Sequence, residues 1–468
     1  MNNFHFSKII AGVWPTLAKE TVLSKVINFV DVFRISLSWW FDDNNKKYID
    51  TLMKLDNSKT IMLETKWTDI RVKNIMDVSV RKGSTVSMDY SEYAQENDKR
   101  IFIDYPGIKN LSIWTKIYFQ QSDILIKVKS TKEEFVICEV LQWWKVLQYD
   151  RVDFGNYEVD VPFFTDKDRK DILRGLEYWV HIIAPSNVRT KDDVIQIKDF
   201  LTEHNAEKMK VISKIENAQS LTHIDQISDI SDWIILVYDK ISSFMTKKKI
   251  SLESLIKKIR SKWKPVIINF IDNFGTNKYP LTDEAYIKKL CYRWIDWFML
   301  DIMIKEDDPL NIITEMSDLL DKYELRLQPK ELERFDENEE SLVRDYIIFN
   351  ACRVIQEVDV RAIVCFTENW YTSSRLASLN PTVPVITFTK SDETYRYLNA
   401  LRWSRWYKIS QSFNYENLKR IWKEMIRIIF KWNISLDDKI LIVQSTEFQK
   451  DSKSDMINWV ELYKFKNI

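Results

Sequence analysis

Eight short apolar runs alternate with amphipathic helix patterns between Lys8 and Ile302, and this alternation limits the folds open to the chain. The runs are KIIAGV, VDVFRISLS, TIMLET, VHIIAPSNV, KVISKIEN, DWIILVY, KPVIINF and WFMLDI. Strands that alternate with helices form parallel sheets, because each helix returns the chain to the end of the sheet at which the previous strand began. Eight such repeats predict a closed (β/α)8 TIM barrel.

The third and fourth runs are separated by a stretch with a different pattern. STVSMDY, KRIFIDY, DILIKVKS and FVICEVL are short β-rich runs, and helical periodicity returns only at TDKDRKDILRGL. We therefore predict an all-β B domain at 72–160, inserted into a barrel formed by 1–71 and 161–338. The segment LVRDYIIFNACRVIQEVDVRAIVCFTEN begins a further βαβ pattern, which predicts a C-terminal α/β domain at 339–468.

Charge and cysteine usage exclude several classes of protein. The chain of 468 residues has 69 basic and 69 acidic side chains, which argues against nucleic acid as a partner. Its four cysteines (Cys138, Cys291, Cys352 and Cys365) are widely spaced and are expected to be reduced thiols. No apolar run approaches a membrane span, and MNNFHFSKIIAGVW is too mixed for a signal peptide. We expect a soluble, cytoplasmic protein without a membrane partner.

Glycine is scarce and tryptophan abundant, which is unusual for this fold class. Glycine occurs 6 times and tryptophan 18 times, where average usage gives roughly 33 glycines in a chain of this length. Helix ends and tight turns need residues with positive φ, a role that glycine normally fills. Many tryptophans fall at such places: Trp179, Trp263 and Trp432 lie between a helix and a strand pattern, Trp370 lies between a strand and a helix, and the doublet Trp143–Trp144 precedes a polar turn.

We interpret most of these tryptophans as glycines of the native protein. Some bacterial lineages read the codon UGA as tryptophan and others read it as glycine, so translation with the wrong table would produce this pattern. The two counts sum to 6 + 18 = 24, which is about 5% of the chain and close to ordinary glycine usage. The alternative is a protein that is truly rich in tryptophan and uses the rings for stacking.

With glycine at those positions, the chain resembles the pyruvate kinase family over essentially its whole length. The segments that carry the resemblance follow in collinear order: KIIAGVWPT, VFRISLSWW, ETKWTDIR, CEVLQWWK, VISKIENAQSLTHIDQI and FTENWYTSSRLASLNPTVPVI. The resemblance implies glycolytic phosphoryl transfer between phosphoenolpyruvate and ADP, giving pyruvate and ATP. It also implies Mg²⁺ and K⁺ as cofactors and a homotetramer.

Lys214 and Glu216 are the strongest candidates for the site. They are two residues apart on one predicted strand, so both side chains lie on the same face. The resemblance implies that Lys214 is catalytic and binds the substrate, and that Glu216 ligates Mg²⁺ through its hard oxygen atoms. The alternative is a structural ion pair at a strand end.

Six further residues are assigned through the resemblance. Arg34 is expected to hold the substrate phosphate, since a guanidinium binds phosphate in a bidentate manner. Lys66 and Arg71 are expected to bind nucleotide phosphate, although each could be an ordinary solvated basic residue. The expected K⁺ ligands, all oxygen donors, are Ser36, Ser38, Glu64 and Thr65.

Several positions depart from the family pattern. Lys240 stands where the family has a second Mg²⁺-ligating Asp, with Asp239 one position earlier, and Phe270 stands where the family has a Thr. A lysine does not ligate Mg²⁺. Two functions therefore stay open: a pyruvate kinase with impaired activity, and a non-catalytic relative that binds phosphometabolites or acts as a regulatory or scaffold subunit. Further departures are Trp39, Asp150, Arg151 and the segment DIMI at 301–304.

The recoding hypothesis predicts which codons encode the tryptophans. We expect UGA at most of the tryptophan positions in the gene, and glycine at those positions when the native protein is sequenced by mass spectrometry. UGG codons at Trp179, Trp263, Trp370 and Trp432 would contradict it.

Overall fold

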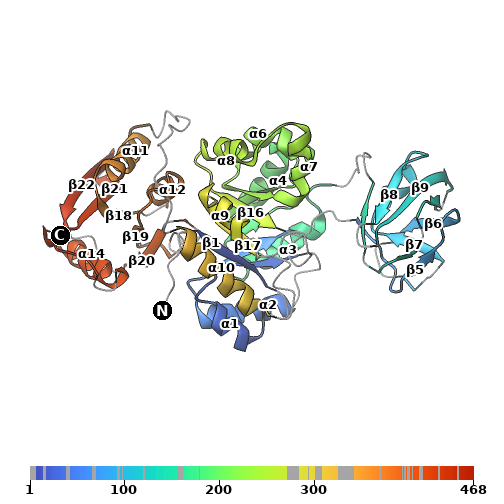
Figure 1. Ribbon diagram of the computed structural model, residues 1–468, viewed down its shortest axis with the longest axis horizontal. Helices are drawn as coiled ribbons and strands as arrows, with labels where there is room; N and C mark the ends of the chain where they lie inside the picture. The colour runs from blue at the N-terminus through green and yellow to red at the C-terminus, as the bar shows by residue number, and fades with distance from the viewer. Residues whose placement is uncertain are drawn as a thin grey trace. The chain divides into compact units, whose positions relative to one another are not determined.

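The protein forms two compact units, Lys66–Thr165 and the remainder of the chain, and each is described separately. The computed structural model describes residues 7–467 apart from 14–16, 38–42, 66–69, 92–94, 97–98, 120–121, 134, 143, 149, 155–161, 179, 271–283, 294, 301–307, 325–341, 368–369, 393, 395–396, 398–400, 403, 410–414, 431–432 and 451–452 (Figure 1). No helix among these residues is long and apolar enough to cross a membrane.

A closed barrel of eight parallel strands forms the centre of the larger unit, as the sequence predicts. Its strands follow the ring order β1-β17-β16-β15-β14-β13-β3-β2, and β1 closes the ring by pairing with both β17 and β2. The strands are β1 (Lys8–Gly12), β2 (Val32–Ser36), β3 (Thr60–Glu64), β13 (Ile182–Ala184), β14 (Lys210–Ile215), β15 (Trp233–Val237), β16 (Val266–Phe270) and β17 (Trp297–Leu300).

Apolar side chains from all eight strands fill the barrel interior. Because side chains alternate along a strand, each strand also presents apolar residues to the surrounding helices, and both faces are buried. The interior cluster contains Ile10, Val32, Met62, Ile182, Ala184, Ile212, Trp233, Ile235, Val237, Ile267, Trp297 and Met299.

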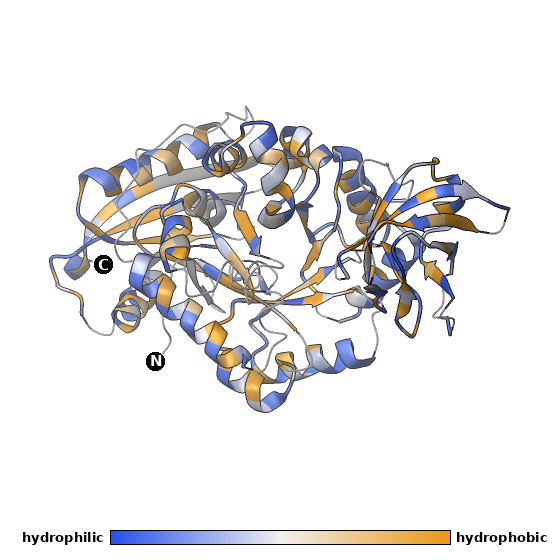
Figure 2. Cartoon of the chain, turned by 45° about the vertical axis from the view of Figure 1, so that its right-hand side comes forward, coloured by the Kyte–Doolittle hydropathy of each residue, from blue (hydrophilic) through white to orange (hydrophobic). Residues whose placement is uncertain are grey.

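The barrel helices are amphipathic and cover the strands. In Figure 1, α4, α6, α7 and α8 lie on one side of the barrel and α1, α2 and α10 on the other, and Figure 2 shows blue and orange residues alternating along the helices. The helices are α1 (Glu20–Val26), α2 (Asp43–Leu55), α3 (Asp166–Leu176), α4 (Lys191–Glu203), α5 (Ala218–Thr222), α6 (Ile224–Ile230), α7 (Tyr238–Lys247), α8 (Leu252–Arg260), α9 (Glu284–Tyr292) and α10 (Pro309–Glu324).

The smaller unit, Lys66–Thr165, is built of β-strands around its own apolar core. One sheet has the order β4-β12-β8-β9-β10-β6-β7, and β11 pairs with β5. The predicted insertion at 72–160 lies within this unit. Its strands are β4 (Ile70–Arg71), β5 (Val78–Val80), β6 (Thr85–Tyr90), β7 (Arg100–Ile103), β8 (Lys116–Phe119), β9 (Ile124–Thr131), β10 (Val136–Val140), β11 (Trp144–Val146) and β12 (Arg151–Asp153).

The C-terminal part of the larger unit is a five-stranded α/β domain with the sheet order β20-β19-β18-β21-β22. Strands β18 to β21 pair in parallel, and β22 is antiparallel to β21. The strands are β18 (Val360–Phe366), β19 (Val385–Thr389), β20 (Ser404–Lys408), β21 (Lys439–Lys450) and β22 (Lys453–Lys464); the helices are α11 (Leu342–Glu357), α12 (Tyr371–Ser378) and α14 (Tyr415–Ile429).

Among the residues that the structure describes, three tryptophans have left-handed backbone conformations. The φ angles are 77° at Trp114, 59° at Trp263 and 60° at Trp370. Trp263 follows helix α8, and its N–H donates to the carbonyl oxygen of Arg260 at 2.8 Å, while Trp370 precedes helix α12. An L-residue with a large side chain is strained there and glycine is not. The recoding hypothesis itself stays a prediction, and Trp143, Trp179 and Trp432 lie outside the described residues.

Other tryptophans occupy ordinary backbone conformations. Trp233 and Trp297 are the first residues of β15 and β17, and their rings meet edge to face inside the barrel with centroids 4.9 Å apart. Trp422 is buried within helix α14. Backbone strain from a left-handed conformation therefore applies to Trp114, Trp263 and Trp370 and not to these tryptophans.

Replacement of Trp114 by glycine is expected to stabilise the protein. The side chain is 66% exposed, so little packing is lost, and relief of the left-handed strain should raise the free energy of unfolding by about 1 kcal/mol. The control is Trp422→Gly, which removes a buried ring from a helix and should lower the free energy of unfolding by about 4 kcal/mol. Urea unfolding followed by circular dichroism measures both, and a Trp114→Gly protein no more stable than its parent would refute the strain argument.

Candidate active site

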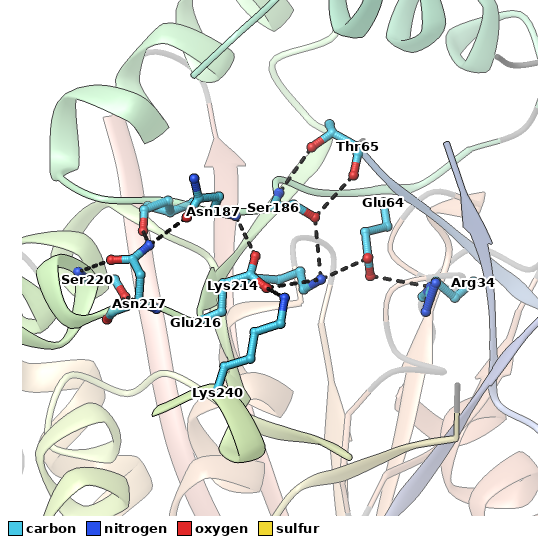
Figure 3. Close-up of polar contacts among 11 residues, drawn as sticks. Arg34, Glu64, Thr65, Ser186, Asn187, Lys214, Glu216, Asn217, Ser220 and Lys240 are labelled. Carbon is cyan, nitrogen blue, oxygen red and sulfur yellow. Dashed lines mark hydrogen bonds and ion pairs between the residues drawn. The ribbon is translucent and has the colours of Figure 1, made fainter. Parts of the chain in front are cut away.

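Charged side chains from adjacent strands meet at the carboxyl end of the barrel. Strands β2, β3, β13, β14 and β15 are neighbours in the ring. Arg34 lies in β2, Glu64 ends β3, Lys214 and Glu216 lie at the end of β14, and Lys240 is in the first turn of α7, directly after β15. Parallel strands in a barrel bring their carboxyl ends to one rim, so residues far apart in the sequence come together (Figure 3).

These five residues form a chain of ion pairs whose charges alternate. Arg34 Nε lies 3.3 Å from Glu64 Oε2, and Lys214 Nζ lies 2.8 Å from Glu64 Oε1. Glu216 Oε2 lies 3.9 Å from Lys214 Nζ and 2.9 Å from Lys240 Nζ. Arg34, Glu64, Lys214 and Glu216 are buried, so each charge depends on its oppositely charged neighbours.

The loop after β13 holds the second oxygen of Glu216. The backbone N–H of Asn187 donates to Glu216 Oε1 at 2.5 Å, and Asn187 has a left-handed φ of 56°. The side chain of Asn217 donates to Asn187 Oδ1 at 2.9 Å and caps helix α5 by accepting from the N–H of Ser220 at 2.7 Å. Asn217 thereby connects the end of β14 to the loop that positions Glu216.

Ser186 connects Lys214 to the end of β3. Its hydroxyl donates to the carbonyl oxygen of Thr65 at 3.1 Å and lies 3.4 Å from Lys214 Nζ. The backbone N–H of Ser186 donates to the Thr65 hydroxyl at 3.1 Å. The ammonium of Lys214 is thus surrounded by oxygen atoms from three strand ends.

The pairing fixes the ionisation of the site. Burial alone would raise the pKa of Glu216, but the charges of Lys214 and Lys240 and the hydrogen bonds from Lys240 and Asn187 lower it to about 2. Burial opposes ionisation of Glu64 as well, and Arg34 and Lys214 hold its pKa below the usual value. Burial would lower the pKa of Lys214, whereas Glu216 and Glu64 raise it. All three groups are therefore charged at neutral pH.

The predicted site residues are only partly brought together. Arg34, Glu64, Thr65, Lys214 and Glu216 form one connected group. Ser36 is half-buried at the end of β2, and its backbone is in register with Glu64. Arg71 belongs to the smaller unit, in strand β4. Ser38, Lys66, Trp39 and residues 301–304 lie outside the described residues.

Three residues that contact the site in the structure are not among the site residues predicted from the sequence. Ser186 and Asn187 follow strand β13 in the run VHIIAPSNV, and a polar pair one proline after an apolar strand is the signal that the sequence offers. Asn217 stands in the KIEN segment beside Glu216. Lys240 is a departure from the family pattern, and the sequence does not predict its ion pair with Glu216. Asp150, another departure, is buried in the smaller unit and accepts from the N–H of Ser122 at 2.9 Å.

The arrangement suits an anionic ligand. Arg34, Lys214 and Lys240 carry three positive charges against two on Glu64 and Glu216, so these five residues have a net charge of 3 − 2 = +1. Within the part of the chain that the structure describes, no group of three His, Cys, Asp or Glu side chains could hold a metal ion. Phosphate is an anion that the guanidinium and ammonium groups of these side chains bind.

The Glu216 pairing predicts an acid-dependent loss of stability. Because its pKa falls from the ordinary 4.5 to about 2 on folding, the stabilisation is complete above pH 4.5 and is lost as the pH falls toward 2. Glu216→Gln should lower the free energy of unfolding at pH 7 by about 3 kcal/mol.

The difference between parent and variant should shrink as the pH falls from 4.5 to 2, measured by urea unfolding. Glu207→Gln, at an exposed position in the turn that precedes β14, is the control and should change stability by less than about 0.5 kcal/mol. A Glu216→Gln effect that is independent of pH would show that the carboxylate is not stabilised by its neighbours.

Comparison with known proteins assigns the family. Residues 4–284 match the model of the pyruvate kinase barrel domain, and residues 345–458 match that of the pyruvate kinase alpha/beta domain. A pyruvate kinase of Bacillus licheniformis is 25% identical over 412 residues, which cover 84% of this chain and 70% of the relative. A pyruvate kinase of Geobacillus stearothermophilus is 26% identical over 428 residues (87% and 72%), and one of Clostridium acetobutylicum is 26% identical over 370 residues (77% and 78%). With its closed eight-stranded barrel and C-terminal α/β domain, the chain belongs to the pyruvate kinase family.

Proposed function

We propose that this protein transfers a phosphoryl group between phosphoenolpyruvate and ADP. The single observation that carries the proposal is the position of Lys214: a buried ammonium at the carboxyl rim of the barrel, held by Glu64 at 2.8 Å. Relatives that cover most of the chain are named pyruvate kinases.

Each cation has a defined task in the proposed reaction. Phosphoryl transfer depends mainly on positioning and on neutralising charge that develops on oxygen atoms. Arg34 would hold the substrate phosphate, and Lys214 would stabilise the transferring phosphoryl group and the enolate oxygen that forms as the phosphoryl group leaves. Both are fixed by Glu64, so neither has to reorganise when substrate binds.

A non-catalytic function is the second candidate, and the Lys240 contact favours it. The family generally uses Mg²⁺ and K⁺. Here both oxygens of Glu216 accept hydrogen bonds, from Asn187 and Lys240, so the carboxylate does not fit Mg²⁺ in this arrangement. A phosphometabolite-binding or scaffold protein could keep the same cations without turnover.

The remaining assignments are parts of the proposal. They are K⁺ at Ser36, Ser38, Glu64 and Thr65, nucleotide phosphate at Lys66 and Arg71, a homotetramer, and a cytoplasmic location. In the described residues the oxygens of Glu64 are engaged by Arg34 and Lys214, so a bound K⁺ would share this carboxylate with two cations.

Pyruvate formation tests the proposed activity. Two proteins are assayed with phosphoenolpyruvate, ADP, Mg²⁺ and K⁺: the parent protein, and a variant with glycine at positions 114, 263 and 370. We expect measurable pyruvate. Lys214→Met removes the ammonium and should lower the rate by about 10³-fold or more. Lys247→Met, at an exposed position on α7, should leave the rate unchanged. Absence of turnover in the parent protein, with metal binding also absent, would favour the binding protein.

A further inference from the structure

Each oxygen of the Glu216 carboxylate accepts a hydrogen bond from a nitrogen donor. Lys240 Nζ donates to Oε2 at 2.9 Å, and the backbone N–H of Asn187 donates to Oε1 at 2.5 Å. The side chain of Glu216 is 0% exposed, and Lys214 Nζ lies 3.9 Å from Oε2, the oxygen that also accepts from Lys240. A divalent cation would have to displace Lys240 before it could reach this carboxylate.

Lys240 is held in place by the fold. It belongs to the first turn of α7, which begins directly after Val237 at the end of β15. Strand β15 pairs with β14 in a register that sets Lys214 beside Ile235 and Ile215 beside Leu236. The side chain of Lys240 is 15% exposed, so its methylene groups are largely packed while the ammonium reaches Glu216 (Figure 3).

The charge balance also disfavours a divalent ion. Arg34, Lys214 and Lys240 already exceed Glu64 and Glu216 by one positive charge. Mg²⁺ needs several oxygen ligands in a near-octahedral arrangement and usually takes one or two carboxylates. Addition of two positive charges next to an ammonium is unfavourable in a buried site, where water screens poorly.

We propose that the ammonium of Lys240 supplies the positive charge that a divalent cation would bring, so that this site binds phosphoenolpyruvate without Mg²⁺. The inference rests on the proposed function, because it takes phosphoenolpyruvate as the ligand. A lysine is covalently attached and always present, so binding of the phosphate and carboxylate groups would not depend on the free metal concentration. Lys214 and Arg34 complete a set of three cations around the ligand.

Calorimetry in the presence and absence of metal tests this inference directly. Phosphoenolpyruvate is titrated into the intact protein in buffer with EDTA and in buffer with Mg²⁺. We expect the two Kd values to agree within about twofold, since the charge comes from side chains. For Lys240→Gln we expect Kd in EDTA to rise by about tenfold or more.

Lys240→Asp should convert the site to metal dependence. The variant places a second carboxylate beside Glu216, so we expect no binding in EDTA and recovery when Mg²⁺ is added. Lys247→Gln on the same helix is the matched control and should bind like the parent protein. Thermal melts in both buffers identify a variant that fails to fold, in which case Lys240→Gln alone decides the matter.

The possible failures are distinguishable. Binding by the parent protein that requires Mg²⁺ would overturn the role of Lys240 and leave the proposed function standing. Metal-free binding that is unchanged in Lys240→Gln would overturn it too. If the parent protein binds phosphoenolpyruvate in neither buffer, the proposed function is overturned together with the inference.

Discussion

Closure of the barrel is the constraint on which the site depends. Strand β1 pairs with both β2 and β17, so the eight parallel strands form one ring with all carboxyl ends at one rim. Arg34 and Glu216, far apart in the sequence, belong to one row of ion pairs because β2, β3, β13 and β14 follow one another in that ring. Lys240 joins them because helix α7 starts immediately after β15. A sheet with the same strands left open would still pair neighbours, but it would lose the packed interior to which all eight strands contribute.

The charges at the rim are stable only as a set. Each buried carboxylate lies between two cations: Glu64 between Arg34 and Lys214, and Glu216 between Lys214 and Lys240. Burial of an unpaired charge is costly, whereas alternation of sign along the row compensates each one. The same contacts occupy the carboxylate oxygens that a divalent ion would need. The stability of the site and the metal-independent binding proposed above therefore rest on the same contact, the Lys240–Glu216 pair.

The backbone φ angles distinguish the tryptophans at strained positions from those at ordinary ones. The sequence singled out Trp263 and Trp370 by their places between helix and strand patterns, and both have positive φ in the structure. Trp114 also has positive φ, although nothing in its surroundings marked it, because it lies in a short turn between β-rich runs without a clear periodicity. Trp233 and Trp297 show the opposite case, since both lie in regular strands and their rings pack against each other. Tryptophan abundance alone therefore does not identify the strained positions; backbone conformation does.

The sequence by itself determined the order of strands and helices, the (β/α)8 fold, and the placing of Lys214 and Glu216 on one strand face. These follow from local periodicity, since apolar runs and alternating side chains are properties of consecutive residues. Only the tertiary structure decided that Lys240 pairs with Glu216, that the N–H of Asn187 holds the other oxygen, and that Ser186 lies between Thr65 and Lys214. The loops after barrel strands have no periodicity, and their partners depend on strand register and ring closure. Contacts between residues far apart in the sequence are set by that geometry and leave no pattern in any short stretch of the chain.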